Sequence, residues 1–281
     1  MRNTKPAKTK PATGQGDELK DLWPGQSIDL LKALHILTRD GKLNADSRRK
    51  LKQVLHLVQV LRPPLDRLFE EKESVRLADL GAGKSYLGFV LYDLIFASRD
   101  HGEILAIEAR DELIETAKRL AGESRFERMK FVHGQISEVP VEGKLDMVTA
   151  LHACDTATDD AILFALRHEA KVVALIPCCQ AEVARQLEDH ARHPLHQLWR
   201  HPIQRRDFAS NLTNVIRALF LEAHGYKVRV TEFVGLEHTF KNELILAERH
   251  QLSNAQARGE LLALLEKLPA RPKLVAGMVP D

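Results

Sequence analysis

The stretch Val75-Arg-Leu-Ala-Asp-Leu-Gly-Ala-Gly-Lys-Ser-Tyr-Leu-Gly88 decides the fold of this chain. An apolar strand runs into Asp79, two glycines follow at Gly81 and Gly83, and a helix-forming run begins at Tyr86. Glycines let a backbone approach a ligand closely, and the free amides at a helix N-terminus attract anionic groups. The pattern therefore predicts the first strand, turn and helix of a nucleotide-type α/β domain.

A second apolar strand supports this interpretation. The segment Gly102 to Glu108 ends in a carboxylate 29 residues after Asp79. In βαβ nucleotide-binding folds a carboxylate at this place accepts hydrogen bonds from the ribose hydroxyls. We expect S-adenosylmethionine as the ligand, with Glu108 on its ribose. Asp79 either contacts the methionine amine or simply caps the glycine turn.

Two other nucleotide folds share part of the motif. Residues 78–85 loosely fit a P-loop, but Ala78 stands where that loop requires glycine, and Asp79 would repel a triphosphate. A dehydrogenase turn requires a third glycine where Ser85 and Tyr86 stand. Both interpretations remain alternatives to a methyltransferase, as does a structural accident.

Length and composition indicate a soluble globular chain. Its 281 residues suffice for one large domain or one domain with a small extension, and 44% hydrophobic with 28% charged residues is ordinary. No apolar run approaches the roughly 20 residues of a membrane span, and the N-terminus lacks a secretory signal. Three cysteines, two of them adjacent, favour a reducing setting, so we expect a cytoplasmic protein.

Basic residues gather in three segments of a chain whose net charge is only +2. The segments are residues 1–11, 42–52 and 192–206. Any one of them could be a solvated face, but together they favour a polyanionic partner, and we expect RNA. In the third segment, Trp199 either stacks on an RNA base beside Arg205 and Arg206 or packs in the interior.

The pattern along the chain predicts four regions. These are a disordered basic tail (1–18), a helical extension (19–73), a methyltransferase domain (74–250), and a C-terminal helix and tail (251–281). In the extension we expect a helix over 28–39, capped by Ser27 and ended by Gly41, and a second from about Asp46 that Pro63-Pro64 breaks.

From Val75 onward strands alternate with helices. Seven strands are expected, at 75–80, 103–107, 129–133, 145–151, 171–176, 227–234 and 242–248. The fold class is therefore α/β, with a Rossmann-like seven-stranded sheet. A short connection joins the last two strands, so they should pair antiparallel. A hairpin that closes a parallel sheet is typical of class I methyltransferases.

The segment Asp79 to Leu87 resembles motif I of class I S-adenosylmethionine-dependent methyltransferases. Its Lys-Ser-Tyr-Leu continuation is similar to a subfamily with three further motifs and a basic helix like Arg49-Lys-Leu-Lys-Gln-Val54. The three motifs here are His152-Ala-Cys-Asp-Thr-Ala-Thr-Asp159, Pro177-Cys-Cys179 and His238-Thr-Phe-Lys-Asn242. The resemblance covers about residues 45–250. A more distant likeness is to the catalytic domain of a tRNA 2′-O-methyltransferase.

The resemblance implies a cofactor site for S-adenosylmethionine. Its residues would be Asp79, Gly81, Gly83, Ser85, Tyr86, Glu108, Ala109, Gln135 and Leu151. Two of them depart from the usual pattern. Ser85 replaces a third glycine and could donate to the cofactor carboxylate. Gln135 replaces an acid that takes the adenine amino group, and its carbonyl can accept the same hydrogen bond.

The reactive methyl group should lie at the end of the fourth strand, at Leu151 and His152. His152, Asp155 and Asp159 are candidate bases or orienting groups, with Asp155 placed to orient the His152 imidazole. The alternative is that Asp155 and Thr156 cap the helix that follows.

The cysteines allow three interpretations. In the first, Cys154 and Cys178 act in covalent catalysis on a pyrimidine. In the second, His152 and the three cysteines bind a metal. In the third, the cysteines are small residues that line the pocket. We expect Cys154 among the catalytic residues and no metal. The expected substrate-binding residues are Cys178, Cys179, Gln180, Lys241 and Asn242, although Lys241 and Asn242 would also suit an ordinary edge strand.

The predicted function is S-adenosylmethionine-dependent methylation of RNA, either tRNA or rRNA. A protein or small-molecule methyltransferase is the alternative enzyme. A non-catalytic RNA- or protein-binding module with the same fold is the alternative outside enzymology.

Overall fold

The computed structural model describes residues 22–151, 153, 155–177, 180–233, 243–276 and 278, except for the side chain of Asp46. Several predictions lie outside the described residues. They concern the basic tail and the residues His152, Cys154, Cys178, Cys179, Lys241 and Asn242.

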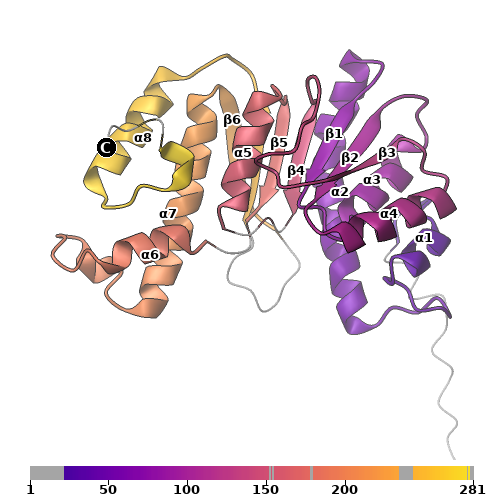
Figure 1. Cartoon of the computed structure of the whole chain (residues 1–281), viewed down its shortest axis with the longest axis horizontal. Coiled ribbons are helices and arrows are strands. Elements are labelled where there is room, and N and C mark those ends of the chain that lie inside the picture. The colour runs from indigo at the N-terminus through magenta and orange to yellow at the C-terminus, as the bar shows by residue number, and fades with distance from the viewer. Residues whose placement is uncertain are drawn as a thin grey trace, which may run out of the picture.

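A seven-stranded sheet forms the centre of the molecule, with the strand order β3-β2-β1-β4-β5-β7-β6 (Figure 1). The strands are β1 (Arg76–Leu80), β2 (Glu103–Glu108), β3 (Met129–His133), β4 (Met147–Leu151), β5 (Val172–Ile176), β6 (Tyr226–Glu232) and β7 (Glu243–Arg249). Strands β1 to β5 are parallel, and β7 runs antiparallel to both β5 and β6. This is the fold class predicted from the sequence.

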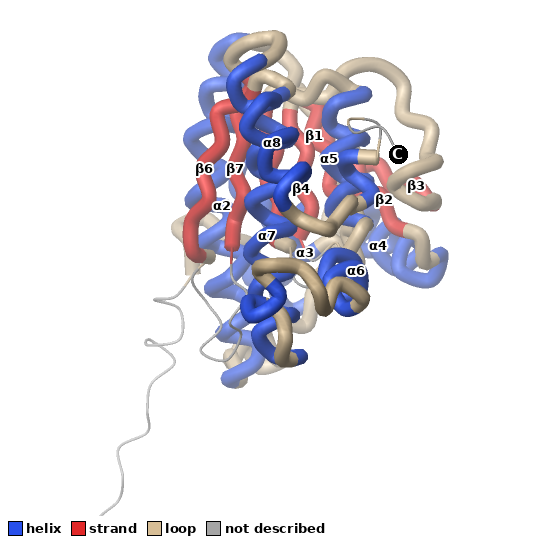
Figure 2. Tube along the Cα trace, turned by 90° about the vertical axis from the view of Figure 1, so that its left-hand side faces the viewer, coloured by secondary structure: helices blue, strands red, loops and turns tan. Residues whose placement is uncertain are grey.

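Alternating side chains of the strands build two cores, one on each face of the sheet. Leu77, Met147 and Leu246 belong to the core under α2 (Ala45–Glu71), α3 (Tyr86–Leu91) and α4 (Asp111–Glu123). Val148 and Ile245 belong to the core under α5 (Ala157–Arg167), α7 (Pro202–Ala223) and α8 (Ala255–Lys267). Figure 2 shows α7 and α8 in front of the sheet. Burial of both faces explains the almost continuous apolar strands.

Shorter elements complete the chain. They are α1 (Ile28–Ala33), a π-helical turn after α3 (Tyr92–Phe96), α6 (Glu182–Glu188) and the 3₁₀ turns His196–Leu198 and Lys273–Val275. Within the described ranges, no helix combines the length and apolarity needed to cross a membrane.

The prediction that Pro63-Pro64 breaks the second helix is wrong. Helix α2 continues through both prolines to Glu71. An interior proline costs about 3 kcal/mol or more, because it lacks a donor and clashes with a carbonyl one turn earlier. The neighbouring Leu61 and Leu65 are fully buried, so packing on the sheet offsets that loss.

The first helix begins as predicted and ends early. The Ser27 side chain accepts a hydrogen bond from the Leu30 amide at 3.2 Å, which confirms the cap. The helix ends at Ala33 rather than near residue 39, and His35 adopts a left-handed backbone with φ 56°. Ile36 and Leu37 are buried beyond this turn, so packing redirects the chain.

Candidate active site

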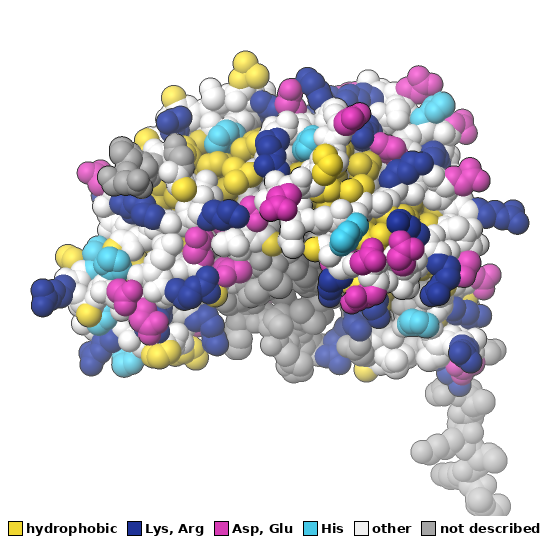
Figure 3. Space-filling model, in the orientation of Figure 1, with side chains coloured by type: hydrophobic (Ala, Val, Ile, Leu, Met, Phe, Trp, Pro, Cys, Tyr) yellow, Lys and Arg dark blue, Asp and Glu magenta, His cyan; other side chains and the backbone are white. Residues whose placement is uncertain are grey.

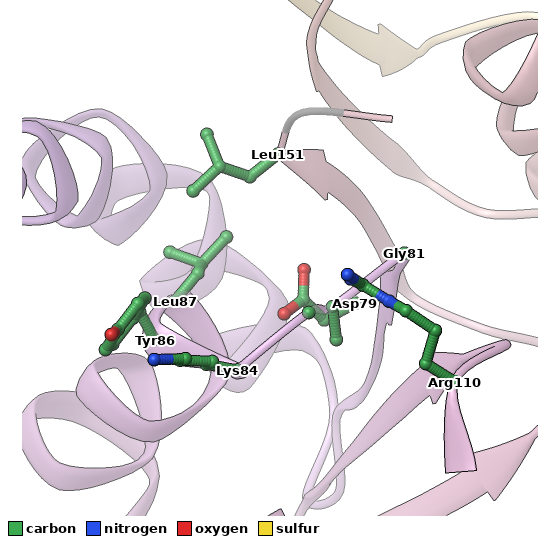
Figure 4. Close-up of a pocket in the computed structure, with 9 residues that line it drawn as sticks. Asp79, Gly81, Lys84, Tyr86, Leu87, Arg110 and Leu151 are labelled. Atoms are coloured by element: carbon green, nitrogen blue, oxygen red, sulfur yellow. The ribbon is translucent and has the colours of Figure 1, made fainter. Parts of the chain in front are cut away.

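A cavity of about 210 Å³ lies at the carboxyl ends of β1 and β4 (Figure 4). It is lined by Asp79, Gly81, Ala82, Gly83, Lys84, Tyr86, Leu87, Arg110 and Leu151. Five of the nine predicted cofactor residues are therefore gathered here. The other four lining residues, Ala82, Lys84, Leu87 and Arg110, were not predicted, although an arginine two residues after a strand-ending acid was a usable signal for Arg110.

The glycine turn has the backbone that its sequence suggests. Gly81 and Gly83 have φ values of 61° and 59°, a left-handed conformation that glycine adopts without steric penalty. The Ala82 amide donates to the Ile107 carbonyl at 3.0 Å, and the Gly83 amide donates to Glu108 Oε2 at 2.7 Å. The turn is thereby fixed to the end of β2.

Glu108 lies behind this turn with only 6% of its surface exposed. Its Oε1 accepts from the Arg110 amide at 3.1 Å and from Arg110 Nε at 2.9 Å. Burial opposes ionisation, but the bonds from Arg110 and Gly83 outweigh it and hold the Glu108 pKa below its usual value. Both carboxylate oxygens of Glu108 already accept hydrogen bonds. A ribose that binds Glu108 must therefore displace the Arg110 side chain.

Asp79 is the buried acid of the cavity, and its carboxylate points into it (Figure 4). It accepts a hydrogen bond from Thr149 Oγ1 at 2.9 Å and another from the Gly88 amide. Burial raises the pKa of Asp79 to about 7, against the effect of these two bonds. A cationic group bound nearby would favour the ionised carboxylate.

Three other predicted cofactor residues do not line the cavity. Ser85 is buried, and its hydroxyl faces Gly88, where it has no partner among the described residues. Ala109 and Gln135 are exposed at the ends of the paired strands β2 and β3. The Ala109 carbonyl accepts from His133 Nε2 at 2.9 Å. These two positions therefore lie just outside the cavity, on the Glu108 side.

Asp155 follows β4 in a left-handed conformation, with φ 50°. Its carboxylate accepts from the amides of Ala181 and Glu182 at 2.9 and 3.1 Å, and from Arg185 at 3.2 Å. Burial opposes ionisation, but these donors hold the pKa below its usual range. Asp155 thus caps α6 rather than α5 and ties the loops after β4 and β5 together. Because its pKa is lowered, the Asp155 carboxylate is a weak base.

Asp159 forms a buried ion pair with Arg217 of α7, with 2.6 Å between Oδ1 and Nε. The two side chains are 2% and 1% exposed. Arg217 Nη2 also donates to the Asp155 carbonyl at 2.8 Å, which supports the left-handed turn. Asp159 is enclosed by this pair and is not placed to act as a base on an acceptor.

A polar chain continues along the same helix. Ser210 Oγ donates to the Gln180 side chain at 2.8 Å, and Gln180 donates to Asn214 at 3.3 Å. Asn214 in turn donates to Glu243, the first residue of β7, at 2.7 Å. Gln180 was predicted to bind substrate. In the structure it is 3% exposed, and its side chain is hydrogen-bonded to Ser210 and Asn214 of α7. Helix α7 therefore holds Asp155 after β4, Gln180 after β5 and Glu243 at the start of β7.

Trp199 is a packing residue, so the stacking role considered for it is wrong. It is 1% exposed and stacks on Phe208, with ring centroids 5.6 Å apart. The large apolar side chains that the same segment exposes are Leu195, Leu198 and Ile203.

Two of the predicted basic segments flank the edge that holds the cavity. Residues 42–52 include the start of α2, and residues 192–206 lead into α7. Each helix runs from this edge to the opposite one, because α2 leads into β1 and α7 leads into β6. The two helices cover opposite faces of the sheet. The segments therefore lie on opposite sides of the same edge.

Comparisons with known proteins agree with this fold. Residues 49–186 match the family model described as "Methyltransferase domain". A curated relative from Bos taurus, a glutathione S-transferase C-terminal domain-containing protein, is 24% identical over 74% of the chain. The chain spans about a third (34%) of the length of that relative.

The chain is also similar to solved structures of methyltransferases. An rRNA methylase from Streptococcus thermophilus has 11% identity and a TM-score of 0.43, over 64% of this chain and 89% of that one. TrmK of M. capricolum, solved with S-adenosyl-homocysteine, has 14% identity and a TM-score of 0.41, over 64% and 65%. These values are too low to transfer an acceptor to this chain.

Residues 49–186 match a methyltransferase domain, and the cofactor expected for such a domain is S-adenosylmethionine. The residues present suit that molecule: left-handed glycines open the turn, a buried carboxylate can face its cationic end, and Glu108 can face its ribose. The cavity is smaller than the roughly 300–1,000 Å³ of typical ligand sites. We infer that Arg110 turns outward when the cofactor binds.

The roles of Glu108 and Arg110 can be separated by substitution. Glu108→Ala should weaken S-adenosylmethionine binding about ten- to hundredfold, because hydrogen bonds to a charged group contribute roughly 1.5–3 kcal/mol. Arg110→Ala should bind at least as tightly as the wild type, since its guanidinium occupies the carboxylate that the ribose requires. Isothermal titration calorimetry measures both. Equal weakening by the two substitutions would show instead that Arg110 holds the cofactor.

Cofactor affinity should depend on pH through Asp79. With a pKa of about 7 in the free protein, only about a tenth of Asp79 is ionised at pH 6, and most of it is ionised at pH 8. If the cationic cofactor binds the ionised form, affinity rises about tenfold over this interval. Titrations at the two pH values measure it, and Asp79→Asn is the control that should bind weakly at both. A wild-type affinity independent of pH contradicts the assignment.

Removing one partner of the ion pair between Asp159 and Arg217 should destabilise the protein far more than removing both. Arg217→Met leaves a buried carboxylate alone and should lower the free energy of unfolding by about 3–5 kcal/mol, while Arg217→Met with Asp159→Leu should lose much less. Denaturant unfolding measures this. Equal losses in the single and double variants would contradict the coupling.

Proposed function

We propose that this protein methylates RNA with S-adenosylmethionine. The observation that carries the proposal is the pair of basic segments, 42–52 and 192–206, on opposite sides of the edge that holds the cofactor turn. A polyanion that crosses this edge would meet cationic side chains on both sides of the reactive methyl group. Leu195, Leu198 and Ile203, exposed in the second segment, offer apolar contacts to unstacked bases.

The sequence motifs support the same acceptor class. The segments His152 to Asp159 and Pro177 to Cys179 resemble a methyltransferase subfamily with a distant likeness to a tRNA 2′-O-methyltransferase. Both segments follow the carboxyl ends of neighbouring strands, β4 and β5. We therefore propose a tRNA or rRNA acceptor held against these two segments.

Methyl transfer from a sulfonium is an in-line displacement, so the protein mainly has to position the acceptor. In our proposal His152 removes the proton of an oxygen or nitrogen acceptor. Asp155 does not act as the base but keeps the loop after β4 in place through the cap of α6. Asp79 and Glu108 hold the cofactor.

A small-molecule acceptor is the second candidate, and a neighbouring cavity favours it. This cavity of about 340 Å³ shares Lys84 and Tyr86 with the cofactor cavity and is otherwise lined by α4 and the end of α1. Its volume falls within the usual range for small ligands.

Transfer of tritiated methyl groups from S-adenosylmethionine distinguishes these acceptors. We expect label in the RNA fraction of a cell extract, sensitive to ribonuclease, with Glu108→Ala greatly reduced at limiting cofactor. Label that resists ribonuclease and passes a small-pore filter would favour the small-molecule acceptor, and label in protein would favour a protein acceptor. Cofactor binding without any transfer would leave a binding module.

A further inference from the structure

A second basic surface lies away from the cofactor cavity, between helix α2 and the edge strand β6. One face of α2 is marked by residues that recur every three or four positions. They are Arg49, Lys52, His56, Gln59, Pro63 and Arg67, all exposed except the half-buried His56. Two contacts show which way this face points. His56 stacks on Phe233 just after β6, with ring centroids 5.3 Å apart, and Arg67 pairs with Glu248 of β7.

Strand β6 supplies the opposite wall. It is the last strand of the sheet, and Lys227 and Arg229 are exposed on it. Their register partners are Glu248 and Leu246, and Leu246 belongs to the core under α2. Lys227 and Arg229 therefore share the face of the sheet that α2 covers.

A cavity of about 410 Å³ occupies this space. It is lined by Arg67, Lys227, Val228, Arg229, Leu246, Glu248, Arg249 and His250. Among these described lining residues Glu248 is the one acid, and Arg67 already pairs with it. Glu169, which lies near Arg249, pairs with Lys144. Positive charge is thus in excess, whereas basic and acidic side chains are interspersed on the face seen in Figure 3.

The groove leads away from the active-site edge. Helix α2 starts at the edge that holds the cofactor turn, and the row from Arg49 to Arg67 is about 27 Å long at 1.5 Å per residue. That length suits a strand of several nucleotides, whose phosphates would meet cations at the two ends of the row, Arg49 and Lys52 at one end and Arg67 at the other.

We propose that the groove between α2 and β6 binds the sugar-phosphate backbone of RNA and guides the acceptor strand to the cofactor edge. This inference rests on the proposed function in one respect, that RNA is the acceptor. It extends the second basic segment, which already contains Arg49 and Lys52, with cations that none of the three basic segments contains: Arg67, Lys227, Arg229 and Arg249.

Binding of a fluorescein-labelled oligouridine of about 20 nucleotides, followed by anisotropy at several salt concentrations, tests the groove. Lys227→Gln with Arg229→Gln removes two cations from the wall. We expect at least a fivefold loss of affinity, and a salt slope reduced by about 1.4, because each lost phosphate contact removes about 0.7. The control is Lys118→Gln with Arg258→Gln, the same charge change on the exposed surfaces of α4 and α8, which should leave both values nearly unchanged.

Calorimetric cofactor affinity should be the same in all three proteins, which verifies their folding. Equal affinities of the groove and control variants for oligouridine would overturn the groove, as would a wild type that binds polyglutamate and not oligouridine. If the groove variant loses RNA affinity but no RNA is methylated, the proposed function fails and the groove stands. If RNA is methylated but the groove variant binds oligouridine as tightly as the wild type, the proposed function stands and the groove proposal fails.

Discussion

The hydrogen bond from the Gly83 amide to the Glu108 carboxylate fixes the geometry of the active-site edge. It joins the turn after β1 to the end of β2, so the left-handed glycines are held in place by the group expected to bind the ribose. A buried carboxylate is stable only when hydrogen-bond donors surround it. Besides the Gly83 amide, Arg110 supplies the donors to Glu108. The same requirement keeps Arg110 in the cavity until another donor, such as a ribose hydroxyl, takes its place.

The residues that follow β4 and β5 are held by a different kind of constraint. No single turn fixes them. Instead, three residues of α7 bind three separate segments: Arg217 binds Asp155, Asn214 binds Glu243 and Ser210 binds Gln180. A buried ion pair contributes little net stability, since desolvation offsets the attraction. Its effect here is geometric, because Arg217 also supports the left-handed Asp155. Helix α7 thereby couples the position of Asp155, which follows β4, to the packing on the sheet.

The sequence predicted the parts of this structure that local patterns determine. The strands, the closing hairpin and the Ser27 cap follow from apolar periodicity and side-chain chemistry. The continuity of α2 through Pro63 and Pro64 did not follow, because buried leucines on both sides override a local rule. The partners of Asp155 and Asp159 were also out of reach. They come from α6 and α7, and only the tertiary fold brings such distant segments together.

Four carboxylates at one edge illustrate how environment assigns different roles to one chemical group. Glu108 and Asp155 are held ionised by backbone amides and arginines, and each ties two segments together. Asp159 is enclosed by Arg217. Asp79 alone among these four has only neutral partners, a hydroxyl and an amide, and burial raises its pKa to about 7. When the sulfonium and the amine of S-adenosylmethionine approach, Asp79 is therefore the carboxyl group expected to lose a proton. The positive charge of the cofactor then balances the negative charge of Asp79.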